Sequence, residues 1–446
     1  MPYRRINNIE IAWDFDSTKH FDDQLYIKDI GDKLFVFLAD GVTQSQCGRI
    51  AATLSIKYII DSLIECENEI RKASSVNNLE KILLESVKFA GDKLKEDREI
   101  LYNYVLIQNL SESYNILRTV YNKVQETIIK FRESISKLQD SVENLRKFCK
   151  DLVNRPSLVL NTDLNTNFDQ IVNIIRQNYD YVTAFRGPFN NLINELQRIK
   201  VSEEYQKEKI LAEKCIMNAI MLLKNGFNMD KLDETIYNFI LPQLQDPFEK
   251  TGIQKENYER GKAKLNQILN TIKFMINDKR ENYRKLEKII QERILNSKEL
   301  IFESTLTVMV FSLNQPTKLL NLILGDSQIY IYNPTSEQWT VVYATSSRGG
   351  LAKYISSVKG ISGEPHISLV TLNENDILIA NTDGANIHYT TPGGQPGAIF
   401  LKKLERFIRE RKTIKGFPEE WINYLREKDA LTDDASIFLL HVLGGI

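Results

Sequence analysis

Cysteine is scarce in this 446-residue sequence and never occurs at the spacing of a metal or redox motif. Because no two cysteines form a CxxC pair, the pattern excludes a zinc ribbon and a disulfide framework. The four histidines are equally scattered and show no ligand spacing. The residues concerned are Cys47, Cys66, Cys149, Cys215, His20, His366, His388 and His441.

The sequence also carries almost no net charge. The chain has 58 Lys and Arg residues against 59 Asp and Glu residues, a formal net charge of -1, so no bulk attraction to nucleic acid or to an anionic membrane is expected. No apolar run approaches the ~20 residues of a membrane span, and the opening stretch MPYRRINNIEIAWDF lacks the apolar centre of a signal peptide. We therefore expect a cytoplasmic protein with neither a nucleic-acid nor a membrane partner.

The composition that remains is typical of a globular protein. Hydrophobic residues make up 42% of the chain and charged residues 26%. The length is sufficient for two or three domains of about 150 residues each.

Aspartates stand at the ends of five predicted strands. Apolar runs such as Leu34–Ala39 have the composition of strands buried on both faces, and each stops at, or starts from, an acidic turn. These turns are FDDQ with Asp22 and Asp23, LADG with Asp40 and Gly41, LGDS with Asp326, NTDG with Asp383, and TDDA with Asp433 and Asp434. If the strand ends converge, they form an all-oxygen pocket of the kind that binds Mg²⁺ or Mn²⁺.

In this order, the motifs FDDQ, LADGV with Gly48, LGDSQ, NTDG and TDDAS resemble the metal-dependent PPM (type 2C) family of serine/threonine protein phosphatases. The resemblance covers about residues 10–100 and 300–446. It implies an α+β fold of the PPM type, an α/β/β/α sandwich of two antiparallel sheets flanked by helices. Here the sandwich is interrupted by an all-helical, coiled-coil-like insertion.

The resemblance also implies a role for each aspartate. Two Mn²⁺ or Mg²⁺ ions would hold the hydroxide that attacks a phosphoryl group in line. The implied catalytic residues are Asp40, which bridges the ions, and Asp383 and Asp433, which hold one of them. The other implied ligands are the Gly41 carbonyl, Asp22 and Asp23 at the second ion (directly or through water), and Asp326 at a third, weaker ion. Asp434 occupies a position often taken by Asn and is not expected to be a ligand.

The site departs from the family pattern in three places. The family has a phosphate-binding Arg where this chain has Thr18, and the adjacent Lys19 is the candidate replacement, although it lacks the bidentate fork of a guanidinium. Val42 stands where some members have a proton-donating His. The stretch Thr345–Glu364, expected to be a mobile loop over the pocket, is shorter than the family's flap. These departures leave open weak phosphate binding, a changed substrate or a site without turnover.

The middle of the chain is predicted to be helical throughout. After helices at Gly48–Arg71 and Asn78–Asp97, apolar residues alternate at steps of four and three from Leu117 to Leu152, which is the coiled-coil period. A second such pattern runs from Tyr258 to Leu295 and is interrupted by Lys279 and Arg293. Shorter helices are expected between them, at Phe168–Phe185, Phe189–Ile199, Glu203–Leu223 and Asp230–Leu241. An outgoing and a returning helix imply an antiparallel arm with a helical head.

We therefore divide the chain into the first part of a phosphatase core (1–100), the helical insertion (101–300) and the second part of the core (301–446). The insertion is either an intramolecular helical domain or an arm for docking a partner or for self-association. The sequence is best explained as a phosphoserine/phosphothreonine phosphatase, a hydrolase of signalling phosphoproteins, whose insertion recognises substrate or partner.

Two alternatives remain. One is a pseudophosphatase, the same fold kept as a binding or scaffold module. The other is a purely structural coiled-coil protein, which leaves both strand-rich regions unexplained.

Overall fold

The structure, a computed structural model, describes residues 2–42, 47–73, 76–154, 162–224, 243–276, 283–297, 299–313, 317–344, 353–388 and 397–444. The chain divides into two compact units, one made of Met1–Val105 and Glu256–Ile446 and the other of Leu106–Lys255. No helix in the described part of the chain is long and apolar enough to span a membrane.

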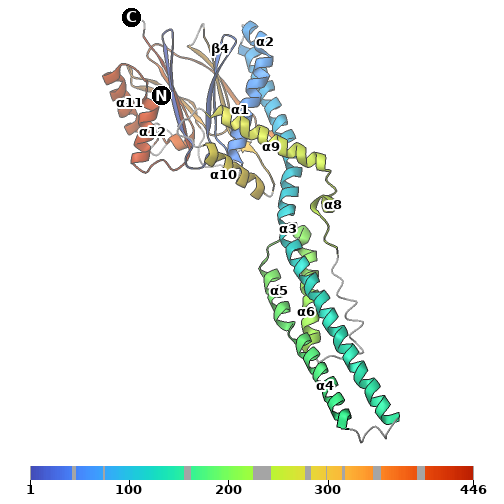
Figure 1. Ribbon diagram of the computed structural model, residues 1–446. Coiled ribbons are helices and arrows are strands. Elements are labelled where there is room, and N and C mark those ends of the chain that lie inside the picture. The colour runs from blue at the N-terminus through green and yellow to red at the C-terminus, as the bar shows by residue number, and fades with distance from the viewer. Residues whose placement is uncertain are drawn as a thin grey trace. The chain divides into compact units, whose positions relative to one another are not determined.

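Two antiparallel sheets form the centre of the first unit (Figure 1). The six-stranded sheet has the order β1 (Tyr3–Ile6), β2 (Ile9–Asp16), β14 (Ala435–Val442), β13 (Ile377–Asn381), β8 (Gln328–Asn333) and β9 (Gln338–Tyr343). The five-stranded sheet has the order β12 (His366–Thr371), β7 (Lys318–Leu324), β6 (Leu306–Ser312), β4 (Lys33–Ala39) and β3 (Gln24–Ile30). A small third sheet joins β11 (Gly360–Ser362), β10 (Tyr354–Ser356) and β5 (Glu303–Ser304).

Strand β4 explains why the two sheets stack. Its sequence KLFVFLA is buried along its whole length, and alternate side chains of a strand point to opposite faces of the sheet. Leu34, Val36 and Leu38 belong to the core between the two sheets. Phe35 and Phe37 belong to the core between this sheet and the helices. A strand that is apolar on both faces requires a packed layer on each side.

Helices cover the outer face of each sheet (Figure 1). The five-stranded sheet shares its outer core with α1 (Gly48–Glu65), α2 (Glu67–Lys72), the first part of α3 (Val76–Asn154), α9 (Lys255–Met275) and α10 (Tyr283–Asn296). The six-stranded sheet packs against α11 (Ala398–Arg411) and α12 (Phe417–Glu427). The layers follow the order α/β/β/α, and the predicted PPM-type sandwich is confirmed.

The helices differ from their predicted extents. The predicted helix Gly48–Arg71 is divided at Cys66 into α1 and α2. The two stretches predicted separately at Asn78–Asp97 and Leu117–Leu152 are one helix, α3, of 79 residues. No proline occurs within α3, so nothing in its sequence interrupts the backbone hydrogen bonds.

The predicted returning helix is also different. Instead of one helix from Tyr258 to Leu295 there are two, α9 and α10, and both belong to the strand-rich unit from Glu256 onward. Their apolar residues, among them Leu265, Ile272 and Ile290, lie in the core over the five-stranded sheet. The returning helix of the predicted antiparallel arm is therefore wrong, because this stretch forms two helices of the strand-rich unit. The periodicity of α9 and α10 fits a sheet-covering helix as well as a coiled-coil helix.

The second unit is wholly helical in its described residues. It contains the remainder of α3, α4 (Thr162–Thr183), α5 (Arg186–Arg198), the 3₁₀ turn η3 (Glu203–Tyr205), α6 (Gln206–Lys224) and α8 (Pro247–Thr251). Predicted seam residues of α3 from Leu117 to Leu138 are buried here, and Phe131 contacts Phe185 and Phe189. Farther along, Cys149 is exposed. The helix predicted at Asp230–Leu241 lies outside the described residues.

We predict that Gly261→Ala destabilises the first unit, although Gly to Ala in a helix usually stabilises. A Cβ at Gly261 in α9 would lie 2.6 Å from the Tyr104 Cβ and 2.8 Å from the Ile100 carbonyl oxygen of α3. We expect a loss of roughly 1–3 kcal/mol in the free energy of unfolding, measured by urea denaturation. The exposed Asn266→Ala on the same helix is the control, and an equal effect of both variants would contradict this packing.

Candidate functional site

Antiparallel pairing brings the aspartate-bearing strand ends to one end of each sheet. In the five-stranded sheet, Gln24 at the start of β3 pairs with Ala39 at the end of β4. In the six-stranded sheet, Asn381 at the end of β13 pairs with both Ile437 of β14 and Gln328 of β8. The aspartates predicted as ligands lie within two residues of these strand ends: Asp22, Asp23, Asp40, Asp326, Asp383 and Asp433.

Two glycines allow the close approach of chain segments here. A Cβ on Gly41, which follows Asp40, would lie 2.3 Å from the Gly48 carbonyl carbon at the start of α1. A Cβ on Gly384, which follows Asp383, would lie 1.8 Å from the Asp434 carbonyl oxygen. No side chain fits at either position, so the glycines of the DG motifs are required by packing.

Asp23 and Asp40 form the centre of the acidic cluster. Burial, then the charge of Asp434, raises the pKa of Asp23 well above its ordinary value. Burial, then the charge of Asp23, does the same for the pKa of Asp40. The Asp23 Oδ2 atom accepts hydrogen bonds from Thr382 Oγ1 at 2.9 Å and Ser436 Oγ at 3.0 Å. Among the described residues, no N–H or hydroxyl group donates to its buried Oδ1 atom, and the Asp23 side chain is hydrogen-bonded to that of Asp40.

The remaining aspartates interact with this pair and with one another. Burial, followed by the charges of Asp326 and Asp433, raises the pKa of Asp383 to about 6. Burial raises the pKa of Asp326, with a contribution from Asp433. The charges of Asp383 and Asp326 also raise the pKa of Asp40. Five carboxyl groups from both sheets are thus near enough to repel one another.

This donor set fits a hard divalent cation. Its atoms are oxygens, and the Asp23 Oδ1 atom has no N–H or hydroxyl donor in the part of the chain that the structure describes. A cation would relieve the repulsion that the hydrogen bond between Asp23 and Asp40 otherwise relieves. Among the described residues, however, no three acidic, His or Cys side chains stand in ready-made metal-binding geometry. The structure therefore brings the predicted ligands together without fixing their coordination.

Asp22 has a partner that the sequence analysis missed. Its Oδ1 atom accepts a hydrogen bond from Arg293 Nη1 at 2.7 Å and another from the Arg49 backbone N–H at 3.2 Å. Arg293 Nη2 also donates to the His20 carbonyl oxygen at 2.7 Å. Burial raises the pKa of Asp22 to about 6, opposed by the charge of Arg293. Asp22 thus anchors α10 to the site.

Arg49 is the second residue that sequence reasoning missed. Its side chain is buried, and Nη1 donates to Ser17 Oγ at 2.9 Å and to the Asp23 carbonyl oxygen at 2.5 Å. Both arginines had a sequence signal. Arg49 is the one charged residue in the first part of α1, Gly48–Ile56, and Arg293 interrupts an apolar period.

The predicted phosphate-binding segment faces outward. Thr18 donates from its N–H and Oγ1 to Asp16 Oδ1 at 2.9 Å and 2.6 Å, and both Thr18 and Lys19 are exposed. His20 Nε2 lies 3.8 Å from Asp433 Oδ1. Part of the predicted loop Thr345–Glu364 is instead the hairpin of β10 and β11. Residues 345–352 of that loop lie outside the described residues.

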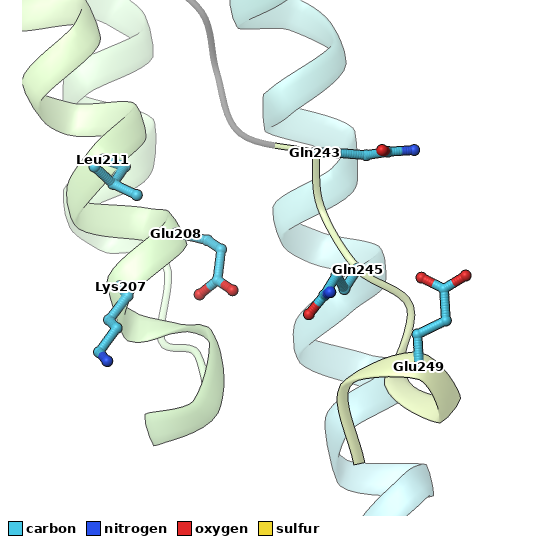
Figure 2. A pocket seen from close by; sticks show the side chains of 6 residues that line it. All are labelled: Lys207, Glu208, Leu211, Gln243, Gln245 and Glu249. Atoms are coloured by element: carbon cyan, nitrogen blue, oxygen red, sulfur yellow. The ribbon is translucent and has the colours of Figure 1, made fainter. Parts of the chain in front are cut away.

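A separate cavity of about 420 Å³ occurs in the second unit (Figure 2). Its lining combines α6 with the segment leading into α8: Lys207, Glu208, Leu211, Gln243, Gln245 and Glu249. The Glu208 carboxylate is neutralised by Lys250. This cavity lacks the paired carboxyl groups of the strand ends, so the strand ends are the candidate site.

We predict that Arg293→Met destabilises the protein at neutral pH, because it leaves the buried Asp22 carboxylate without its counter-charge. The side chain of Arg293 is 31% exposed, so we expect roughly 1–3 kcal/mol in the free energy of unfolding. In a double-mutant cycle with Asp22→Asn the loss should be largely cancelled. Additive effects of the two substitutions would show that this ion pair does not form.

We predict that Asp383→Asn stabilises the metal-free protein above pH 6. The folded-state pKa of Asp383 is raised from its ordinary 3.8 to about 6, so its ionisation opposes folding as pH rises from about 4 to about 6. The variant should be more stable than wild type at pH 7, by an amount that the solvent exposure of Asp383 reduces, and should show a shallower fall in stability across that window. Thermal unfolding at several pH values measures this, with the exposed Asp92→Asn as control. A variant less stable than wild type at pH 7 would contradict electrostatic repulsion between Asp383 and its acidic neighbours.

No family model matches the sequence, and no curated protein is significantly similar to it. Among solved structures, the chain is similar to a serine/threonine phosphatase of S. agalactiae, with 10% identity, a TM-score of 0.40, and coverage of 97% of this chain and 99% of that one. It is also similar to the catalytic domain of the serine/threonine protein phosphatase PstP in complex with two manganese ions, with 11% identity, a TM-score of 0.24, and coverage of 53% and 82%. The phosphatase domain of SpoIIE from Bacillus subtilis matches with 17% identity, a TM-score of 0.22, and coverage of 42% and 74%. The fold is consistent with the PPM family, as the sheet order and strand-end motifs described above indicate.

Proposed function

We propose that this chain is a metal-dependent phosphatase of phosphoserine and phosphothreonine residues in proteins. The observation that carries the proposal is the meeting of acidic strand ends from two different sheets, centred on Asp23 and Asp40. Burying several like charges side by side is costly, and a fold gains nothing in stability from it. Binding of divalent cations at this site would explain why the fold nevertheless brings these carboxylates together.

The proposed ligands are the carboxylates and one carbonyl at these strand ends. Asp40 would bridge two ions, the Gly41 carbonyl would join one of them, and Asp383 with Asp433 would hold the other. Asp23 would contribute to the second ion, and Asp326 to a third and weaker one. Bound Mn²⁺ or Mg²⁺ supplies a water activated at neutral pH and offsets charge on the phosphoryl group.

The Asp22 Oδ1 atom already accepts two hydrogen bonds. We therefore propose that Asp22 contacts an ion through water and that its main role is to hold Arg293. Lys19 is exposed and is proposed to meet the phosphate as a point charge. Val42 stands where some family members have a proton-donating His, so the leaving group is proposed to depart as an anion or to take its proton from water.

The helical unit is proposed to recognise a protein, either the substrate or a partner. On α6 the exposed apolar residues Ile210, Met217 and Met221 follow a spacing of seven and four, which places them on one helix face. Exposed apolar residues on one face support protein contact.

A second candidate is a pseudophosphatase that uses the same fold as a binding module. Two observations favour it: the Asp22 oxygen is engaged by Arg293, and Thr18 is turned toward Asp16. Both would weaken phosphate or metal binding without disturbing the sandwich. The two candidates predict different catalytic activity.

We predict Mn²⁺-dependent hydrolysis of p-nitrophenyl phosphate and of a phosphothreonine peptide by the purified chain. Asp40→Asn should reduce kcat by at least 100-fold, since it removes the bridging carboxylate. Release of p-nitrophenol and of inorganic phosphate measures the activity. Asp92→Asn, an exposed aspartate of α3, should retain full activity. A folded protein inert with Mn²⁺ and Mg²⁺ would instead support the binding module.

A further inference from the structure

We propose that Asp434 is a positioning residue that fixes the segment carrying Asp22 and Asp23, and thereby sets the affinity of the site for divalent ions. This inference rests on the proposed function. It assigns a role to a residue that the motifs alone leave without one, because Asp434 was not expected to be a ligand.

The Asp434 carboxylate accepts hydrogen bonds from four backbone N–H groups of one segment. Oδ1 lies 3.0 Å from the N atoms of both Lys19 and His20. Oδ2 lies 2.6 Å from the Asp22 N atom and 3.4 Å from the Asp23 N atom. The residue is only 2% exposed. Both oxygens are thus fully engaged with the backbone, which leaves Asp434 to act through the residues it holds.

The held segment connects the two sheets. It begins after β2, whose last residue Asp16 pairs with Ala435 in the six-stranded sheet. It ends at β3, whose first residue Gln24 pairs with Ala39 in the five-stranded sheet. Asp434 directly precedes β14, so its carboxylate fixes the point at which the chain crosses from one sheet to the other.

The same residue is connected to the other acidic positions of the site. Its backbone N–H donates to Asp433 Oδ1 at 2.8 Å. Its carbonyl oxygen occupies the space next to Gly384, directly after Asp383. Asp23, which Asp434 holds by the backbone, is held by the side chain through Thr382 and Ser436 of the six-stranded sheet. Asp434 therefore fixes Asp23 of one segment relative to Asp433 of another.

In this chain the Asp434 carboxylate satisfies all four donors, whereas the Asn that the resembled family often has at this position would satisfy only some of them. An ionised Asp offers about four acceptor positions and no proton. An Asn of the same shape replaces one oxygen by an NH₂ group, which would face two N–H donors and leave them unsatisfied. Asp434→Asn is therefore a nearly isosteric change that loosens one half of the segment.

The chain contains a matched control. Asp376 is also a buried carboxylate, 4% exposed, that accepts a backbone hydrogen bond, from Asn373 N at 2.7 Å, and one from Asn333 Nδ2 at 2.7 Å. It directly precedes β13, whereas the acidic cluster follows that strand. Asp376→Asn should therefore cost comparable stability without affecting the site.

The experiment is a Mn²⁺ titration of the full chain by isothermal calorimetry, with wild type, Asp434→Asn and Asp376→Asn compared. We expect Asp434→Asn to weaken Mn²⁺ binding about 10–100-fold, the usual effect of removing a group that orients ligands. Asp376→Asn should remain within about twofold of wild type. At saturating Mn²⁺ the KM of Asp434→Asn for p-nitrophenyl phosphate should be unchanged, since the residue does not touch substrate. An equal effect of the two variants would overturn the inference.

Hydrogen exchange of the metal-free wild type tests the same contacts without any variant. The amides of Lys19, His20, Asp22 and Asp23 should be protected by at least 10-fold relative to a freely exchanging loop. Rapid exchange of all four would also overturn the inference, even if Asp434→Asn fails to fold. A wild type that binds no Mn²⁺ overturns the proposed function and this inference together, whereas intact wild-type binding with an unaffected Asp434→Asn overturns this inference alone.

Discussion

The repulsion among the carboxylates that cluster at the strand ends is the constraint on which the rest of the first unit depends. Asp23, Asp40 and Asp383 are held close enough to raise one another's pKa or that of a common neighbour. Without a cation this arrangement opposes folding, so the surrounding structure must compensate. The stacked apolar faces of the two sheets, represented by β4 and β14, supply that compensation.

A second set of contacts holds the acidic segment in place. The segment before β3 is bound by the Asp434 carboxylate, by the buried Arg49 guanidinium and by Arg293 of α10. Each of these comes from a different part of the chain. Ligand geometry at the site therefore depends on contacts that are remote in sequence, which is typical of sites that need precise carboxylate placement.

Much of the core was predictable from the sequence, because strand ends carry a local signal. An apolar run followed by Asp-Gly defines both where β4 and β13 stop and which side chain stands there. The pairing of the strands, and hence the convergence of Asp40 with Asp23 and Asp383, followed only from the family resemblance. The hydrogen bond between the Asp23 and Asp40 side chains and the four donors to Asp434 could not be predicted, because they depend on the exact path of the chain.

The helical region was harder to predict for a physical reason. An apolar face with steps of three and four fits any surface that covers it, so the pattern in α9 could not distinguish a sheet from a partner helix. The charge of Arg293 at an apolar position was the one sign that α10 faces something polar. That polar partner is Asp22 of the candidate site.

The most direct test of the central claim is the anomalous scattering of Mn²⁺ in crystals of the chain grown with that ion. The account predicts two strong peaks between the two sheets, bridged by the Asp40 carboxylate and flanked by Asp23, Asp383 and Asp433. Crystals that show no anomalous density at these strand ends, whether or not Mn²⁺ is bound elsewhere, would contradict it.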